Sequence, residues 1–366
     1  MKISPFIQNL KPYVAGKSIE EVQREYGLKE IVKLASNENA LGPNPKVLEA
    51  ARKALTDIHR YPDASYITSK KIIATHFKVQ PNNISLGNGS NELIDMLIRV
   101  FCEPNQDEIL ISQASFIAYK VCAHVNRVNV TEVPIKKNFQ MDIEAMANAL
   151  TDKHKIIFLP NPNNPTGMYI SRKELEPLLN KVRGRGDVLL VIDEAYNEFV
   201  RAADYPNSQS LFKEFKNVVV LRTFAKVHGL AGLRLGFMMA DPHIVDLLER
   251  IRLPFNVSNI TASTIDVALN DSDYIKKSQE VVWQGLEYFE SELKNMGLEY
   301  CPSQGNFIFF DLKADSSLIF EELLKRGVIL RPVKNYGFPT HMRMSVGTMA
   351  ENKKAIESLK EVLKNI

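Results

Sequence analysis

The sequence predicts an α/β fold, with a largely parallel sheet covered by helices on both faces and a smaller α+β domain after it. Short continuous apolar runs recur over residues 41–250, and such runs are typical of strands that are buried on both faces. Segments with apolar residues at helical spacing lie between these runs, and this alternation favours an α/β architecture. From residue 273 onward a long amphipathic segment and a few further strands and helices indicate the smaller domain.

The expected elements follow in chain order. In the first domain we expect strands at 82–86, 107–112, 127–133, 155–159, 188–192 and 218–221, with helices that include 91–101, 142–150 and 172–182. In the second we expect helices at 273–296, 316–326 and 349–365, and strands at 306–311, 327–331 and 341–346. The predicted division is an N-terminal arm over 1–40 that packs on the small domain and substrate site, a large domain over 41–250 and a small C-terminal domain over 251–366.

Composition narrows the class of protein. The 366 residues include 46 Lys plus Arg against 43 Asp plus Glu, a formal charge of +3, and 45% are hydrophobic. This is ordinary globular composition, and so small a surplus of positive charge does not make a general nucleic-acid binder. No apolar run approaches the roughly 18 residues of a membrane span, and the first residues lack the apolar stretch of a signal peptide. Three scattered cysteines indicate no disulfide framework. We therefore expect a cytoplasmic protein without nucleic-acid or membrane partners.

Several common catalytic motifs are missing from the sequence. It contains no G-x-x-x-x-G-K-[ST], no G-x-S-x-G and no H-E-x-x-H, and its seven histidines are dispersed. These absences weaken the interpretations as a P-loop ATPase, a serine esterase or a zinc hydrolase. We expect no metal site.

A glycine-rich turn lies between an expected strand and an expected helix. Residues 87–91 read GNGSN, and backbone N–H groups at a helix N-terminus bind phosphate where glycine permits close approach. A dinucleotide fingerprint needs a third small residue, and Glu92 stands there instead. The turn therefore favours a phosphate site over a nicotinamide site, and a plain strand–helix turn is the alternative.

Asp193 ends the apolar run 188–192, at the carboxyl end of an expected parallel strand, where ligands of open α/β sheets bind. A carboxylate at this position can keep a heterocyclic nitrogen protonated, because an opposite charge favours the charged form. Two alternatives remain: an N-cap aspartate for the next helix, and a metal-binding Asp-Glu pair whose usual phosphate-loop partner is missing here.

Lys226 stands alone in a loop of small residues after the strand 218–221, and Arg234 follows eight positions later. A lysine that is partly desolvated near other cations has a lowered pKa and can form a Schiff base. A lone lysine is normally a solvated surface charge, but Phe224, Ala225 and Val227 make a poor setting for one.

Two further segments carry polar chemistry. Residues 160–167 (PNPNNPTG) follow a buried strand, and the asparagines of this rigid turn can hydrogen-bond a ligand. Arg331 and Arg343 lie in neighbouring expected strands, and arginine is the preferred bidentate partner of carboxylate and phosphate. The pair can form one anion pocket, although a surface ion pair is the usual role of either arginine alone.

Together these segments resemble the fold-type I pyridoxal-phosphate aminotransferases, and within them the histidinol-phosphate aminotransferase subfamily. The resemblance runs from about residue 13 to the last helix and rests on residues 33–39 (KLASNEN), 60–63 (RYPD), 87–92 (GNGSNE), 163–167 (NNPTG), 193–196 (DEAY), 222–226 (RTFAK), 229–234 (GLAGLR) and 343–348 (RMSVGT). It implies a large domain with a mixed, mostly parallel sheet that binds pyridoxal 5'-phosphate, plus a smaller α+β domain.

The resemblance also implies roles for individual residues around the cofactor. Lys226 would bind it covalently and then move the proton, and Asp193 would pair with the ring nitrogen. Tyr196 and Asn164 would hydrogen-bond the ring hydroxyl while Phe116 stacks on the ring. The cofactor phosphate would be held by Gly89, Ser90, Thr223 and Arg234, together with Tyr61 from the second subunit of a homodimer.

For the substrates, the resemblance implies that Arg343 binds the α-carboxylate of glutamate, with Arg331, Tyr13 and Asn91 as further contacts. The implied reaction converts L-histidinol phosphate and 2-oxoglutarate to imidazole-acetol phosphate and glutamate, in histidine biosynthesis. An aromatic amino-acid aminotransferase and a threonine-phosphate decarboxylase of the same fold remain alternatives. The chain departs from the family pattern at Ala225, where many relatives have serine, at Ala40, often proline, and at Phe116, often tyrosine.

Overall fold

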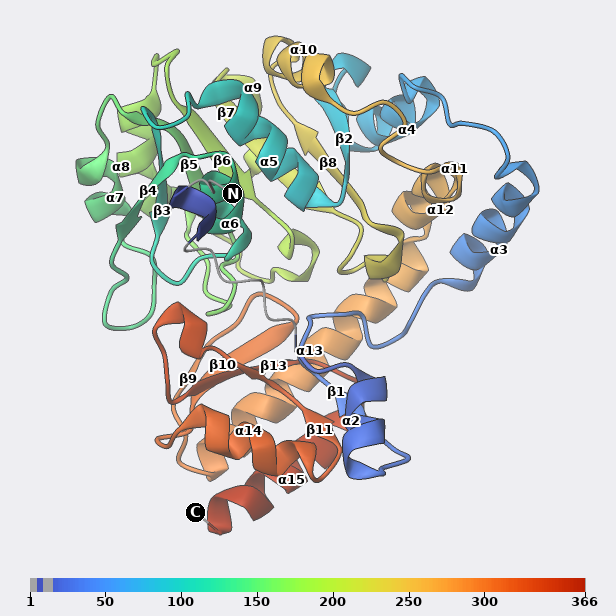
Figure 1. Cartoon of the computed structure of the whole chain (residues 1–366), viewed down its shortest axis with the longest axis vertical. Coiled ribbons are helices and arrows are strands. Elements are labelled where there is room, and N and C mark those ends of the chain that lie inside the picture. Colours follow the sequence, from blue (N-terminus) through green and yellow to red (C-terminus); the bar gives the residue numbers. More distant parts are fainter. Residues whose placement is uncertain (1–4, 9–15, 366) are drawn as a thin grey trace.

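The computed structural model describes residues 5–8 and 16–365, which build two main sheets with their own helices (Figure 1). The larger sheet has the order β2 (Ile84–Asn88), β8 (Leu235–Met239), β7 (Val218–Thr223), β6 (Leu189–Asp193), β5 (His154–Pro160), β3 (Glu108–Ser112) and β4 (Asn129–Val133). Neighbouring strands from β7 to β4 are parallel, and β8 is antiparallel to both β7 and β2. The predicted mixed, mostly parallel sheet is confirmed.

Helices cover both faces of this sheet. Side chains alternate along each strand, so Ile156 and Phe158 of β5 pack on one face while Ile157 and Leu159 pack on the other. The first face is covered by α5 (Ser90–Phe101), α6 (Ala118–Val125) and α10 (Pro242–Ile251), and the second by α4 (Ile67–Phe77), α7 (Ile143–Ala149), α8 (Arg172–Val182), α9 (Ser208–Glu214) and α12 (Ile265–Asn270). Burial on both faces is why these strands read as continuous apolar runs.

The second sheet is antiparallel, with the order β12 (Arg331–Pro332), β13 (His341–Ser345), β10 (Phe307–Asp311) and β9 (Tyr300–Cys301). It packs with α13 (Ser272–Asn295), α14 (Ser316–Leu324) and α15 (Met349–Lys364) around one apolar core. In Figure 1 this part lies below the larger sheet, and α13 runs between the two. In the described part of the chain, no helix is both long and apolar enough to cross a bilayer.

The N-terminal part of the described chain joins the smaller sheet region. After the short α1 (Pro5–Gln8), a capping box formed by Ser18 and Glu21 starts α2 (Ile19–Tyr26). Next, β1 (Val32–Lys33) pairs in parallel with β11 (Val328–Ile329). The chain then crosses to the larger sheet, where α3 (Pro45–Ala54) packs against α11 (Asn259–Ser263) and α12. The division into three regions stays a prediction.

Some strands in the structure differ from the expected ones. The strand 235–239 was not predicted, because a glycine interrupts its apolar run; Gly236 is needed there, since a Cβ would lie 2.5 Å from the Ser90 backbone nitrogen. The strand predicted at 127–133 begins at Asn129, because Arg127 adopts a left-handed turn conformation with φ 60°. The strand predicted at 327–331 is divided at Leu330: β11 pairs with β1, while β12 pairs with β13.

Candidate active site

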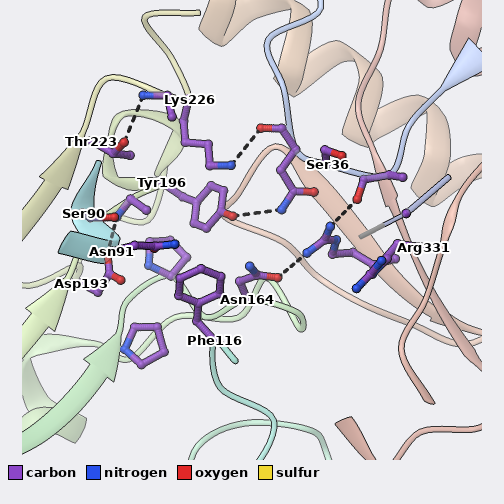
Figure 2. A pocket seen from close by; sticks show the side chains of 18 of the residues that line it. Ser36, Ser90, Asn91, Phe116, Asn164, Asp193, Tyr196, Thr223, Lys226 and Arg331 are labelled. Atoms are coloured by element: carbon purple, nitrogen blue, oxygen red, sulfur yellow. Dashed lines mark hydrogen bonds between the residues drawn. The ribbon is translucent and has the colours of Figure 1, made fainter. Parts of the chain in front are cut away.

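A cavity of about 210 Å³ lies where the carboxyl ends of the parallel strands face the N-terminal segment and the smaller sheet (Figure 2). Many of the site residues predicted from the sequence line it: Ser90, Asn91, Phe116, Asn164, Asp193, Tyr196, Thr223, Lys226, Arg234, Arg331 and Arg343. These residues are far apart in the chain, so the strand order of the sheet is what gathers them in one place.

Asp193 is the last residue of β6 and is buried on the cavity wall. Burial raises the pKa of its carboxyl to about 6, and a hydrogen bond from the Tyr119 hydroxyl to Oδ2, 2.8 Å long, opposes that rise. Tyr119 is fully buried and stacks on Phe158 with ring centroids 4.6 Å apart. Its position is therefore set by packing, and its hydroxyl is aimed at the carboxylate.

Lys226 lies in the loop after β7 and points into the cavity (Figure 2). Burial, together with the positive charges of Arg343 and Arg234, lowers the pKa of its amine to about 8. Asp193 acts in the opposite direction. Because the pKa is close to neutral, a substantial fraction of the amine is unprotonated and nucleophilic near pH 8. The Nζ atom donates a hydrogen bond of 3.2 Å to the backbone oxygen of Asn37.

An anion cradle lies at the N-terminus of α5. Gly89 is the N-cap, with φ 75°, and a Cβ on it would lie 2.4 Å from Nη2 of Arg234. Only glycine therefore lets this guanidinium lie directly against the helix start. The first N–H groups of a helix have no partner within the helix, and together with Arg234 they favour a negatively charged ligand. Thr223 lies beside them, and its hydroxyl accepts a 3.1 Å hydrogen bond from the Ala225 nitrogen.

Glu92 does not enter this cradle. Its carboxylate accepts hydrogen bonds from the Asn88 nitrogen at 2.5 Å and from the Asn256 side chain at 2.7 Å. It thus stabilises the turn from outside the lining.

Arg343 connects the smaller sheet to the cavity. Its guanidinium donates to Oδ1 of Asn164 and to the backbone oxygen of Ala35, each at 2.6 Å. It lies directly opposite Arg331 in the β12–β13 ladder, so the two arginines are neighbours across strands. Both line the cavity, which gives one end of it two positive charges.

Among the described residues, Tyr61 and Gly89 are the predicted site residues that do not line this cavity. The Tyr61 side chain is 81% exposed and stacks on Phe255 with ring centroids 4.6 Å apart. Tyr13 lies outside the described residues. Gly89 lies directly against the Arg234 guanidinium and leaves the space that this side chain occupies.

Sequence reasoning missed two polar partners. Tyr119 lies three residues after Phe116, a helical spacing that places both on one side of the segment, and their rings meet edge-on at 5.7 Å. Asn37 belongs to segment 33–39, one of those on which the family resemblance rests. No feature of the local sequence indicates that its side chain reaches Tyr196.

A buried carboxylate, a lysine with a lowered pKa, an anion cradle and a pair of arginines in one cavity define an enzyme site for a small, negatively charged ligand. The family description "Aminotransferase class I and II" matches residues 29–359, and the chain belongs to this family. It is an aminotransferase with the fold-type I architecture.

Individual relatives agree with this assignment. A histidinol-phosphate aminotransferase of Bdellovibrio bacteriovorus is 48% identical over 100% of this chain and 99% of its own length. One from an Anaeromyxobacter species is 43% identical, with 99% of each chain covered. The structure of histidinol-phosphate aminotransferase from Sinorhizobium meliloti in complex with pyridoxal-5'-phosphate superposes with a TM-score of 0.90 at 27% identity, covering 100% of this chain and 98% of that one.

Proposed function

We propose that the chain transfers the amino group of L-histidinol phosphate to 2-oxoglutarate with pyridoxal 5'-phosphate as cofactor, giving imidazole-acetol phosphate and glutamate. The observation that carries the proposal is the neighbouring pair Arg331 and Arg343 in the same cavity as Lys226 and Asp193. A lysine and a carboxylate around the cofactor are common to many transaminases and do not by themselves indicate the substrate. A doubly cationic end that suits a phosphate ester as well as a carboxylate is what favours histidinol phosphate. The relatives named above point to the same substrate.

The residues present fit the cofactor. Its phosphate matches the cradle of Gly89, Ser90, Thr223 and Arg234, where a Cβ at position 89 would collide with the guanidinium. Its ring would lie between Phe116 and the strand ends, with Asp193 at the ring nitrogen and with Asn164 and Tyr196 at the ring hydroxyl. When bound, pyridoxal phosphate supplies an aldehyde that captures the substrate amine and a ring that delocalises the electron pair released at carbon.

Lys226 performs the proton chemistry in this proposal. Its amine, whose pKa is lowered to about 8, is basic enough to take a proton from the substrate carbon and acidic enough to return it. Asp193 stays ionised near neutral pH because its pKa is about 6 and Tyr119 donates to it. Its negative charge then holds the ring nitrogen protonated.

The arginine pair allows one pocket to serve two half-reactions. Histidinol phosphate has no carboxylate, so its phosphate would contact Arg331 and Arg343. Glutamate would place its α-carboxylate on Arg343 in the other half-reaction. The charge of Arg343 is oriented by Asn164 and Ala35 before either substrate arrives, which reduces the entropy that binding must offset.

The proposal includes a homodimer located in the cytoplasm. Large apolar side chains are exposed within one short segment of the chain, namely Leu55 at 50%, Ile58 at 63% and Tyr61 at 81%, and Tyr61 stacks on Phe255. Such a patch marks a protein–protein interface. In the dimer, Tyr61 would reach the cofactor phosphate of the other subunit.

The deciding experiment is a substrate panel on purified protein loaded with pyridoxal phosphate. We expect the highest kcat/KM for histidinol phosphate, below it phenylalanine, and no decarboxylation of threonine phosphate. A higher kcat/KM for phenylalanine would reassign the substrate class while leaving the cofactor chemistry intact. Borohydride reduction followed by peptide mapping tests the cofactor separately: attachment at any position except Lys226 contradicts the proposed chemistry.

A further inference from the structure

Asn37 occupies an unusual place between the two sheets. It is 1% exposed, lies in the left-handed region with φ 54°, and lines the cavity. Its side-chain nitrogen donates to the Tyr196 hydroxyl at 3.0 Å, and its backbone oxygen accepts from Nζ of Lys226 at 3.2 Å. Figure 2 marks these two hydrogen bonds with dashed lines that begin at the labelled Tyr196 and Lys226 side chains. A single asparagine thus contacts both the tyrosine and the lysine of the proposed chemistry.

Ser345 determines which way the Asn37 amide faces. The Asn37 backbone nitrogen donates to Ser345 Oγ at 2.8 Å, so the serine hydroxyl uses a lone pair there. Its hydrogen is then directed to Oδ1 of Asn37, also at 2.8 Å. An asparagine side chain has one acceptor end and one donor end, so anchoring Oδ1 on the serine turns the NH₂ group toward Tyr196.

The direction of the hydrogen bond at Tyr196 follows from this arrangement. A phenol has one hydrogen to donate, and an incoming N–H occupies one of its lone pairs. The Tyr196 hydroxyl accepts from Asn37, so its own hydrogen is left to point elsewhere. Since Tyr196 lines the cavity and is 4% exposed, that hydrogen is available to a ligand there.

We propose that Asn37 is a positioning residue that directs the Tyr196 hydrogen into the cavity while its backbone oxygen holds the amine of Lys226. The inference rests on the proposed function, because it assigns the Tyr196 hydrogen to the ring oxygen of the cofactor. Ser345 lies two residues after Arg343 on β13, and residues at this spacing face the same side of a strand. The strand that carries the anion-binding arginine therefore also controls donation by Tyr196.

Asn37→Gly isolates the side chain, because glycine accepts the positive φ and keeps the backbone oxygen that faces Lys226. In protein loaded with pyridoxal phosphate, we expect kcat for the half-reaction with histidinol phosphate to fall about three- to tenfold, the range of one neutral hydrogen bond. We also expect the pH midpoint of the cofactor absorbance to rise by about half a unit. With a weaker donor at Tyr196, the ring oxygen of the cofactor keeps more negative charge. The proton on the nearby Lys226 nitrogen is then held more tightly.

The Tyr196→Phe variant tests whether Asn37 acts through the Tyr196 hydroxyl. If Asn37 acts through Tyr196, adding Asn37→Gly to Tyr196→Phe should change kcat by less than twofold. The pH midpoint should then move by less than about 0.2 units. The matched control is Asn306→Ala, which removes a buried asparagine that donates to the Glu38 oxygen at 3.2 Å, one residue along the same segment. This control is expected to lower thermal stability without moving the midpoint.

Ser345→Ala gives an independent test if Asn37→Gly does not fold. Without the serine hydroxyl the amide can turn over, so the midpoint should shift in the same direction by a smaller amount. The inference is overturned if neither variant moves the midpoint, or if Asn37→Gly has its full effect in the Tyr196→Phe background. Failure of the proposed function is distinguished from this result, because it shows in the unmodified protein as an absence of cofactor on Lys226.

Discussion

Replacing Tyr119 by phenylalanine is expected to weaken cofactor binding through Asp193 alone. The ring that stacks on Phe158 is retained, and only the hydroxyl that donates to Oδ2 of Asp193 at 2.8 Å is lost. This hydrogen bond lowers the pKa of the buried carboxyl, so its removal raises that pKa. A hydrogen bond to a charged group contributes about 1.5–3 kcal/mol, which at about 1.4 kcal/mol per unit corresponds to a rise of about one to two units.

The expected rise changes the charge of Asp193 at neutral pH. From a value of about 6, the pKa would move to about 7–8, so the ionised fraction at pH 7 falls from about nine-tenths to about a half or less. Pyridoxal-phosphate affinity should therefore decrease several-fold at pH 7 and recover above pH 9, where the carboxyl ionises in both forms. The measurement is the dissociation constant of the cofactor as a function of pH, followed by absorbance.

Tyr169→Phe is the matched control for this experiment. It removes a tyrosine hydroxyl that donates to a carboxylate, Asp204, at 2.7 Å, but outside the cavity lining. Its binding curve should coincide with that of the unmodified protein. The reasoning would be refuted if the pH below which cofactor affinity falls were unchanged in Tyr119→Phe. It would also be refuted if that pH rose equally in Tyr169→Phe.

Three further variants test other parts of the site. Gly89→Ala should weaken pyridoxal-phosphate binding by at least tenfold in an absorbance titration. The added Cβ would lie 2.4 Å from the Arg234 side chain, and the φ of 75° costs an alanine about 1–2 kcal/mol. Unchanged affinity would show that the cradle does not hold the phosphate. Arg331→Gln should lower kcat/KM for histidinol phosphate about 10- to 150-fold, the range of a charge-assisted hydrogen bond, and affect glutamate less; equal losses in steady-state assays would argue against a role in phosphate recognition. Ile58→Lys, at an exposed apolar position, should shift the sedimentation coefficient toward that of a monomer, whereas Leu318→Lys, also exposed at 65%, should not.

Much of the fold followed from local patterns. Strands β5, β6 and β7 are buried on both faces and have continuous apolar sequences, so their positions were predictable within a residue or two. The strand β8 was missed because Gly236 interrupts its apolar run, and the need for that glycine, a close approach to the start of α5, is not visible in the local sequence. The division of 327–331 between two sheets likewise depends on pairing with β1 and β13, which are distant in sequence.

The chemical identity of the site was already present in the amino-acid sequence: a lysine among small residues, a carboxylate after a buried strand, a glycine turn before a helix and two arginines near the end. Side-chain chemistry and short-range spacing are local properties, so they can be read without coordinates. Only the tertiary structure decided how these groups act on one another. The contacts of Tyr119 with Asp193 and of Asn37 with Tyr196 join residues 74 and 159 positions apart. Such contacts depend on strand order and register, which are set by the packing of the whole chain.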